Sequence, residues 1–231
     1  MGKFDRTIAL FGEENFDKLK KTKILIFGIG GVGGYTVEAL ARSGIENFCL
    51  VDGDVVSESN INRQIIATTK SVGRAKVEVM KERILEINPD AKVETKKLFY
   101  LPQNAEQVCF EEYDYIVDAV DTVTAKLDII ERASRLNKKI ISAMGAGNKI
   151  DATGFVVADI FDTKVCPLAK VTRKELKARG IEKLKVVYSE EIPYNCTTDE
   201  NGKRVPCSNA YVPGMAGLTM AGEIIIDIIN E

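Results

Sequence analysis

Glycine and aspartate residues near the start of this chain have the types and spacing of a nucleotide-binding site. Gly28, Gly30 and Gly33 form a Gly-x-Gly-x-x-Gly pattern directly after a short apolar run. Glycines allow a tight turn and a close approach of the backbone to phosphate oxygens, and the helix that follows presents free N–H groups at its N-terminus. Asp52 comes 19 residues after Gly33, at the end of a second apolar run. An acidic side chain at that distance accepts hydrogen bonds from ribose hydroxyls, so the pattern predicts a nucleotide site.

Three charged residues further along indicate which nucleotide binds. Arg63 and Lys76 follow the second apolar run and suit the phosphates of ATP, and Asp121, just beyond a later run, suits Mg²⁺. Asp118 has the same chemistry, but it lies within that run, so we interpret it as a structural, hydrogen-bonded residue. A dehydrogenase needs no Asn-x-Asn-Arg-Gln sequence after Asp52. The pattern therefore favours ATP and Mg²⁺ over NAD.

The sequence contains no histidine, which removes several catalytic classes. Imidazole is unavailable as a general base or a metal ligand, so serine–histidine and cysteine–histidine hydrolases are excluded. The five cysteines form no Cys-x-x-Cys pair, which argues against a tetrahedral zinc site. A reaction whose nucleophile is already ionised at neutral pH remains, such as the attack of a carboxylate on a phosphorus atom.

Strand and helix patterns alternate along the first two thirds of the chain. The alternation predicts right-handed βαβ units, and hence a Rossmann-like, doubly wound, three-layer α/β/α fold with a mainly parallel sheet. Residues 155–160 and 184–188 alternate like antiparallel strands and are expected to add to that sheet. The other strands are expected at residues 23–27, 47–52, 92–99, 113–120 and 139–144, and the helices at residues 1–22, 35–42, 74–87, 125–136 and 215–229.

Length and composition are those of a single globular domain. The 231 residues, 45% of them apolar and 29% charged, allow one domain over residues 1–231, with a nucleotide-binding half at 1–150 and a substrate-side half at 151–231. The N-terminus lacks the apolar core of a signal peptide, and no segment approaches the ~20 apolar residues of a membrane span. The odd number of dispersed cysteines fits a reducing compartment, so we expect a cytoplasmic location.

Basic residues gather in the second half of the chain. Residues 163–187 hold eight basic side chains against two acidic ones, a net charge of +6 in a chain whose total is −2. Such a segment is either a solvated helix face or a docking surface for a polyanion, whose phosphates lysine and arginine side chains would contact. Both interpretations stay open on composition alone.

The motifs of the first half, taken in order, resemble the ThiF/MoeB/HesA superfamily, which is related to ubiquitin-activating enzymes. The resemblance covers about residues 5–150. It implies that Asp52 binds ribose, that Arg63 and Lys76 contact phosphates and that Asp121 holds Mg²⁺. The motifs that carry it are Gly-x-Gly-Gly-x-Gly at residues 28–33, Asp-x-Asp at 52–54, Asn-x-x-Arg-Gln at 60–64, Val-Gly-x-x-Lys at 72–76, Ile-Asn-Pro at 87–89 and Asp-x-x-Asp-x-x-x-x-Lys at 118–126.

The resemblance also implies a dimer, because Arg6 matches an N-terminal arginine that reaches the ATP site of a neighbouring subunit. We therefore expect a homodimer, with Arg6, Arg63, Lys76 and Asp121 as the catalytic residues. The nucleotide-binding residues are expected to be Gly28, Gly30, Gly31, Gly33, Asp52, Asp54, Asn60, Arg63, Gln64, Lys76 and Asp121.

Within the superfamily the chain most resembles the tRNA threonylcarbamoyladenosine dehydratases. Residues 6–12, 38–45, 167–171, 186–191 and 211–213 extend this resemblance over nearly the whole chain. It implies ATP-dependent cyclisation of a modified base beside the anticodon of tRNA, through an acyl-adenylate of its threonyl carboxylate. Cys166 departs from the pattern, which has aspartate there. The resemblance also favours the docking interpretation of the basic segment, with Lys170, Arg173, Lys174, Lys177 and Arg179 as candidate tRNA contacts.

Two other functions compete with this one. Relatives that adenylate the C-terminal carboxylate of a ubiquitin-like sulfur-carrier protein often hold paired Cys-x-x-Cys zinc ligands, which this chain lacks, and some use a thiol placed near Cys196. We interpret Cys196 as an ordinary loop or core cysteine, and a cysteine desulfurase or sulfur-acceptor protein stays an open partner. A catalytically silent nucleotide-binding scaffold is disfavoured, because Arg63, Lys76 and Asp121 are all present.

Overall fold

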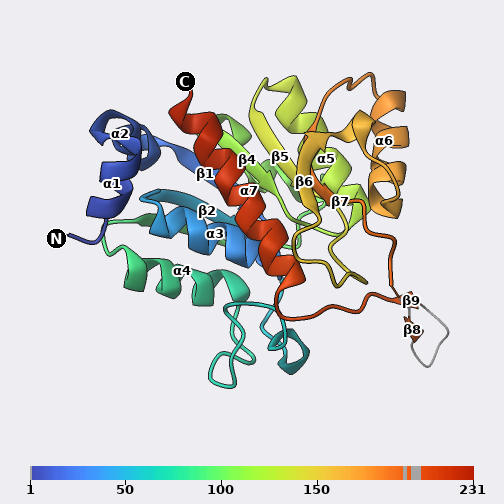
Figure 1. Ribbon diagram of the computed structural model, residues 1–231, viewed down its shortest axis with the longest axis horizontal. Helices are drawn as coiled ribbons and strands as arrows, with labels where there is room; N and C mark the ends of the chain where they lie inside the picture. Colours follow the sequence, from blue (N-terminus) through green and yellow to red (C-terminus); the bar gives the residue numbers. More distant parts are fainter. Residues whose placement is uncertain (1, 195–196, 199–203) are drawn as a thin grey trace.

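A seven-stranded sheet forms the centre of the computed structural model, which describes residues 2–194, 197–198 and 204–231 (Figure 1). The strand order is β3-β2-β1-β4-β5-β7-β6. All neighbouring pairs are parallel except β7 and β6, so β6 is an antiparallel edge strand. The strands are β1 (Lys23–Phe27), β2 (Asn47–Val51), β3 (Lys92–Lys96), β4 (Tyr115–Asp118), β5 (Lys139–Ala143), β6 (Phe155–Asp159) and β7 (Lys185–Ser189), with a separate short pair of β8 (Thr197–Thr198) and β9 (Arg204–Val205).

Helices cover both faces of the sheet, which makes three layers. Helices α2, α3, α4 and α7 pack on one face, and α5 and α6 pack on the other with three short 3₁₀ helices (Figure 1). The helices are α1 (Asp5–Phe11), α2 (Glu13–Lys21), α3 (Gly33–Arg42), α4 (Lys76–Ile87), α5 (Val123–Arg135), α6 (Pro167–Ala178) and α7 (Val212–Ile229), with 3₁₀ helices η1 (Glu58–Asn60), η2 (Pro102–Gln107), η3 (Phe110–Glu112) and η4 (Ile160–Asp162). The predicted fold class is confirmed.

Helices on both faces explain why the central strands read as apolar runs rather than alternating ones. Four of the five residues of β1 and all four of β4 are buried, as expected for parallel strands covered on each side. The expected antiparallel strands are present too, since β6 pairs with β7 from Phe155–Ser189 to Asp159–Lys185. β7 itself runs parallel to β5, so only the edge strand reverses direction.

Helix α7 begins earlier than predicted, at Val212, with Pro213 in its first turn. By length and composition alone it is the one helix of the described chain that could cross a membrane, and 56% of its apolar stretch is buried inside the fold. Asp227 lies within this helix, and its carboxylate accepts hydrogen bonds of 2.6 Å from Tyr115 Oη and from Lys185 Nζ. These contacts are those of a core helix packed on a sheet.

Candidate nucleotide-binding pocket

A pocket of about 770 Å³ opens where the parallel strands end, the edge at which open α/β sheets bind their ligands. Its walls come from the loops after β1, β2, β3, β4 and β5 and from the start of α6. It brings together ten of the predicted site residues: Gly28, Gly30, Gly31, Asp52, Asp54, Asn60, Arg63, Gln64, Lys76 and Asp121. Gly33, Arg6 and the basic residues of the second half do not line it.

The glycine loop after β1 packs too tightly for side chains at two of its positions. Gly28 has φ +89°, and a Cβ atom there would lie 2.7 Å from Ala119 O in the neighbouring loop. A Cβ on Gly33, the first residue of α3, would overlap Gly28 O. Gly33 thus sets how closely α3 approaches β1, and Gly28 and Gly30 supply the backbone that lines the pocket.

Asp52 lies at the end of β2 with both carboxylate oxygens held by backbone amides. Ile29 N donates to Oδ2 at 2.7 Å and Asp54 N donates to Oδ1 at 2.8 Å. Burial raises the pKa of this carboxyl group above its usual range, against the opposing effects of Lys76 and of the two amides. Each oxygen keeps a second acceptor site, so the carboxylate is pre-positioned to accept hydrogen bonds from two vicinal hydroxyls.

Lys76 places a nearly buried ammonium group at the start of α4. Its side chain is 7% exposed, and Nζ donates to Asp54 Oδ2 at 2.7 Å. The backbone N–H of Lys76 also donates to Asp54 O at 3.1 Å, so the first turn of the helix is tied to the loop after β2. A cation at a helix N-terminus that also lines a pocket suits phosphate binding.

Asn60 ends η1, and the loop that follows carries Arg63 and Gln64. Asn60 Oδ1 accepts from Ser57 N at 3.1 Å, while Arg63 NH1 donates to Ser59 O at 2.8 Å, which leaves the rest of the guanidinium for a ligand. Gln64 Oε1 is buried and has no hydrogen-bond partner within the described chain. A buried acceptor without a partner is costly, so this atom fits a donor brought by a bound molecule.

The glycine, acidic and basic residues thus meet in one pocket, and the comparison with protein families covers the same region. The ThiF family model matches residues 4–230. The chain belongs to the ThiF family.

Among ThiF-related proteins, the tRNA threonylcarbamoyladenosine dehydratase of Bacillus subtilis is 39% identical over 241 residues, which span 99% of this chain and 95% of that protein. The crystal structure of the Escherichia coli tRNA N6-threonylcarbamoyladenosine dehydratase in complex with AMP has a TM-score of 0.91 at 33% identity and covers 99% of this chain and 94% of that one. The same enzyme in complex with ATP has a TM-score of 0.89. The adenylyltransferase and sulfurtransferase UBA4 of Candida glabrata is 35% identical over 132 residues, which span 57% of this chain and 30% of that protein.

Phe99, which no motif of the sequence marks, forms part of this ThiF pocket beside Asp52. Phe99 is 60% exposed. A Cβ on Gly53 would lie 2.7 Å from both the ring atom Cδ2 and the backbone N of Phe99, so the ring packs directly on the Gly53 backbone. Asn104 fixes the loop, since Nδ2 donates to Phe99 O at 2.8 Å and Oδ1 accepts from Leu101 N at 2.9 Å. The position of Phe99 at the end of a predicted strand was the available signal.

The far wall of the pocket follows β5 and was also missed, although the Gly-Ala-Gly sequence after a predicted strand marks it. It contains residues 143–149 together with Cys166, the N-cap residue of α6. Lys149 is 5% exposed, and Nζ donates to Glu191 O at 2.6 Å. Burial lowers the pKa of Lys149, while Cys166 and Glu191 oppose this shift. Cys196, the candidate thiol of the sulfur-carrier alternative, lies outside the described residues.

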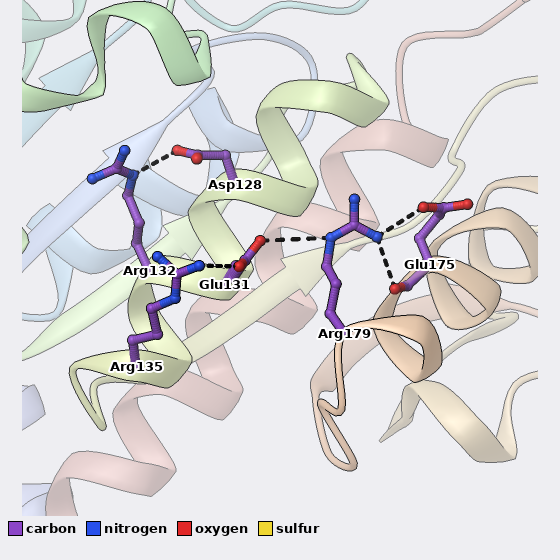
Figure 2. A network of polar contacts seen from close by, with 6 residues as sticks. All are labelled: Asp128, Glu131, Arg132, Arg135, Glu175 and Arg179. Carbon is purple, nitrogen blue, oxygen red and sulfur yellow. Dashed lines mark hydrogen bonds and ion pairs between the residues drawn. The ribbon is translucent and has the colours of Figure 1, made fainter.

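The basic segment forms α6 and its flanks. Its basic residues differ in exposure and in whether their charged groups already bind within the fold. Lys170, Lys174 and Lys177 are exposed on the helix. Arg173 is half-buried, and its guanidinium donates to Thr163 O at 2.8 Å. Arg179 joins α6 to α5, because it pairs with Glu175 at 2.7 Å and with Glu131 at 3.5 Å (Figure 2).

Arg6 lies on α1, where it is exposed and away from the residues that line the pocket. Asp121 is exposed on the loop between β4 and α5 and does line the pocket. Asp118 is fully buried and pairs with Lys126 at 2.7 Å, so its expected structural role is confirmed.

Proposed function

We propose that this ThiF-family protein is an ATP-dependent dehydratase that cyclises threonylcarbamoyladenosine in tRNA. The observation that carries the proposal is the single pocket of about 770 Å³, which joins a nucleotide-binding wall after β1 and β2 to a separate wall after β5. The two walls leave room for ATP and for the acyl group that reacts with it. Relatives with this activity match the chain over nearly its full length.

The proposed reaction has two steps. A carboxylate oxygen of the threonyl group attacks the α-phosphorus of ATP, and the bond to the bridging oxygen breaks as pyrophosphate leaves with its electron pair. A nitrogen of the carbamoyl group then attacks the acyl carbon, loses its proton, and displaces AMP to close a hydantoin-type ring. One oxygen of the carboxylate leaves in AMP, so the modified base loses one water.

The residues of the first wall take distinct parts in this scheme. Asp52 accepts hydrogen bonds from the ribose hydroxyls, the ring of Phe99 stacks on the adenine, and Lys76 and Arg63 bind phosphate oxygens. Their positive charge lowers the repulsion between the attacking carboxylate and the triphosphate, and the fixed pocket holds the two reactants in contact. Asp54 and Asn60 act indirectly, since their own hydrogen bonds orient Lys76 and the loop of Arg63.

Asp121 is the proposed ligand of Mg²⁺. The described residues contain no group of three or more metal-binding side chains, which suits Mg²⁺, because this ion usually takes one or two carboxylates and fills its shell with phosphates and water. When bound, Mg²⁺ supplies neutralising charge to the phosphate groups that react.

A homodimer and a cytoplasmic location complete the proposal. The position of Arg6 outside its own pocket supports a role in the pocket of a second copy. A mixture of Arg6→Ala and Asp121→Ala variants, each inactive alone, should then recover part of the activity, because one of the two sites in a mixed dimer is intact. No recovery, with dimers present by light scattering, would exclude this role.

The exposed lysines of α6 are the proposed contacts to tRNA, because α6 begins at the pocket wall and carries Lys170, Lys174 and Lys177 on one face. This assigns residues 1–150 mainly to ATP and residues 151–231 mainly to the substrate. The alternative substrate, a ubiquitin-like sulfur carrier served by a cysteine desulfurase, is less well supported. UBA4 matches little more than half of the chain.

Mass spectrometry of tRNA nucleosides tests the proposed activity. Incubation of threonylcarbamoyladenosine-containing tRNA with the protein, ATP and Mg²⁺ should remove one water from the modified nucleoside and release AMP and pyrophosphate in equal amounts. The Asp52→Ala variant should give neither product. Unchanged tRNA, together with adenylation of a small protein that ends in Gly-Gly, would replace the dehydratase proposal with the sulfur-carrier alternative.

A further inference from the structure

A buried ion pair lies directly beneath the pocket. Asp118 ends β4 and Lys126 lies on α5, and both side chains are fully buried. Lys126 Nζ donates to Asp118 Oδ2 at 2.7 Å, to Ser142 Oγ at 3.1 Å and to Ala143 O at 3.0 Å. Ser142 Oγ donates to the same Asp118 oxygen at 2.6 Å. The three N–H groups of the ammonium are therefore all used, and none of them is left for a ligand.

The pair lies at the point where β4 and β5 separate. Asp118 and Ser142 are the last residues of these strands to face each other in the ladder. Beyond them the chains diverge and form two pocket walls, residues 119–122 and residues 143–149. The network continues into both walls, since Asp118 Oδ1 accepts from Val120 N at 3.2 Å and Lys126 holds Ala143 O. These hydrogen bonds connect the two segments at the point where the β4–β5 ladder ends.

Stability alone does not account for such a pair, because apolar side chains of similar volume often replace a buried ion pair without loss of stability. We propose that Lys126, Asp118 and Ser142 form a positioning unit that fixes the loop of Asp121 relative to the wall after β5. This inference rests on the proposed function in one respect, namely that Asp121 binds Mg²⁺. The unit touches neither ATP nor substrate, and it acts by holding the residues that do.

Variants of the unit separate positioning from stability. The Lys126→Met/Asp118→Leu double variant exchanges the pair for apolar side chains, and Ser142→Ala removes one arm while leaving the pair. For the double variant, the Mg²⁺ concentration that gives half-maximal pyrophosphate release should rise about tenfold. ATP affinity without Mg²⁺ should stay near that of the wild type. Ser142→Ala should also raise the Mg²⁺ concentration for half-maximal pyrophosphate release, but by a smaller factor.

Amide hydrogen exchange gives a readout that does not depend on activity. Exchange of residues 119–122 should accelerate about tenfold or more in the double variant, because their anchor is lost. Lys138→Met is the matched control. Lys138 Nζ also donates to backbone carbonyls, Glu111 O at 2.7 Å and Tyr113 O at 2.8 Å. These carbonyls lie before β4, whereas Ala143 O, which the positioning unit holds, lies at the end of β5. Lys138→Met should leave exchange of residues 119–122 and the Mg²⁺ dependence unchanged.

Two results would overturn the proposal. One is a variant that unfolds at a lower temperature while exchange of residues 119–122 and Mg²⁺ dependence equal those of the wild type. The other, if the double variant does not fold, is a folded Ser142→Ala protein with neither change. Failure of the wild type to release pyrophosphate would instead contradict the proposed function, and the exchange experiment would still test the positioning unit.

Discussion

At the scale of single residues, the proposed stacking of Phe99 on adenine predicts that this one side chain contributes to the affinity for ATP. Its exposed ring is fixed in the pocket on the Gly53 backbone, beside the carboxylate proposed to bind ribose. Stacking of a base on an aromatic ring contributes about 1–3 kcal/mol. Phe99→Ala should therefore weaken ATP and AMP binding about tenfold or more, as measured by calorimetry, while Phe99→Tyr stays near the wild type.

Inorganic triphosphate provides the control for this prediction, because it has no base to stack. Its binding should be the same in Phe99→Ala as in the wild type. Equal weakening of ATP and triphosphate would mean that the substitution disturbs the phosphate site and that the ring does not face the base.

Glu38 is a residue through which the stability of the fold depends on pH. Burial raises the pKa of its carboxyl group, but hydrogen bonds from Arg83 and Arg42 outweigh this effect and hold the pKa below its usual range. A depressed folded-state pKa stabilises the fold above the unfolded value, and that stability is lost as the pH falls through the folded value. Glu38→Gln should lower the free energy of unfolding by about 2 kcal/mol at neutral pH.

Urea unfolding at neutral pH and at about pH 3 measures this difference, which should shrink on acidification because the stabilising contribution of the ionised Glu38 carboxylate declines as the pH falls from the unfolded-state pKa toward the lower folded-state pKa. Glu86→Gln, an exposed change on the same helix as Arg83, is the control and should have little effect at either pH. A constant difference between Glu38→Gln and the wild type would contradict the assignment.

Residues close in sequence were the predictable part of the site. Gly28, Gly30 and Asp52 lie at the ends of adjacent strands of one βαβ unit, so their spacing already specifies that they meet. Phe99 and Lys149 carry no such spacing. They reach the pocket because β3 and β5 are added on the two sides of that unit, which only the order of the strands in the sheet determines.

At the scale of elements, a glycine at the contact allows α7 to pack closely against α3. A Cβ on Gly217 would overlap Val32 O and lie 3.0 Å from Thr36 N, and Thr36 Oγ1 donates to Gly217 O at 3.1 Å. Gly217→Ala should therefore destabilise the protein by about 2 kcal/mol in urea unfolding. Gly222 lies on the same helix with open space around it, so Gly222→Ala should stabilise by about 0.5–1 kcal/mol. Similar effects of both substitutions would mean that helix propensity, not the crossing, dominates.

The start of α7 could not be predicted from the sequence, because it depends on tertiary packing. The sequence places Tyr211, Val212 and Pro213 in a stretch rich in glycine, proline and asparagine, which reads locally as a loop. In the fold, Val212 is fully buried and Pro213 packs near Gly31. Tertiary packing therefore extends the helix over residues whose local preference is weak, whereas the strands, whose apolar runs need no partner to be recognised, were located to within a few residues.

On the scale of the whole molecule, the charge distribution predicts how tRNA binds. Residues 163–187 carry +6 in a chain of net charge −2, and Lys170, Lys174 and Lys177 are the exposed lysines of α6, which begins at the pocket wall. Arg173 and Arg179 are left unchanged in the test, since their guanidinium groups bind within the fold. Replacement of the three lysines by glutamine should weaken tRNA binding and reduce the slope of log K against log salt by about two.

The matched control removes the same charge from the opposite edge of the sheet, where the parallel strands begin. Lys21, Lys23 and Lys92 are exposed there, at the end of α2 and at the starts of β1 and β3. Their replacement by glutamine should leave the salt slope near that of the wild type, because a polyanion that reaches the pocket does not cross that edge. ATP affinity should be unchanged in both triple variants. If the two variants lose the same slope, tRNA responds to net charge alone, and α6 is a solvated helix face rather than a docking surface.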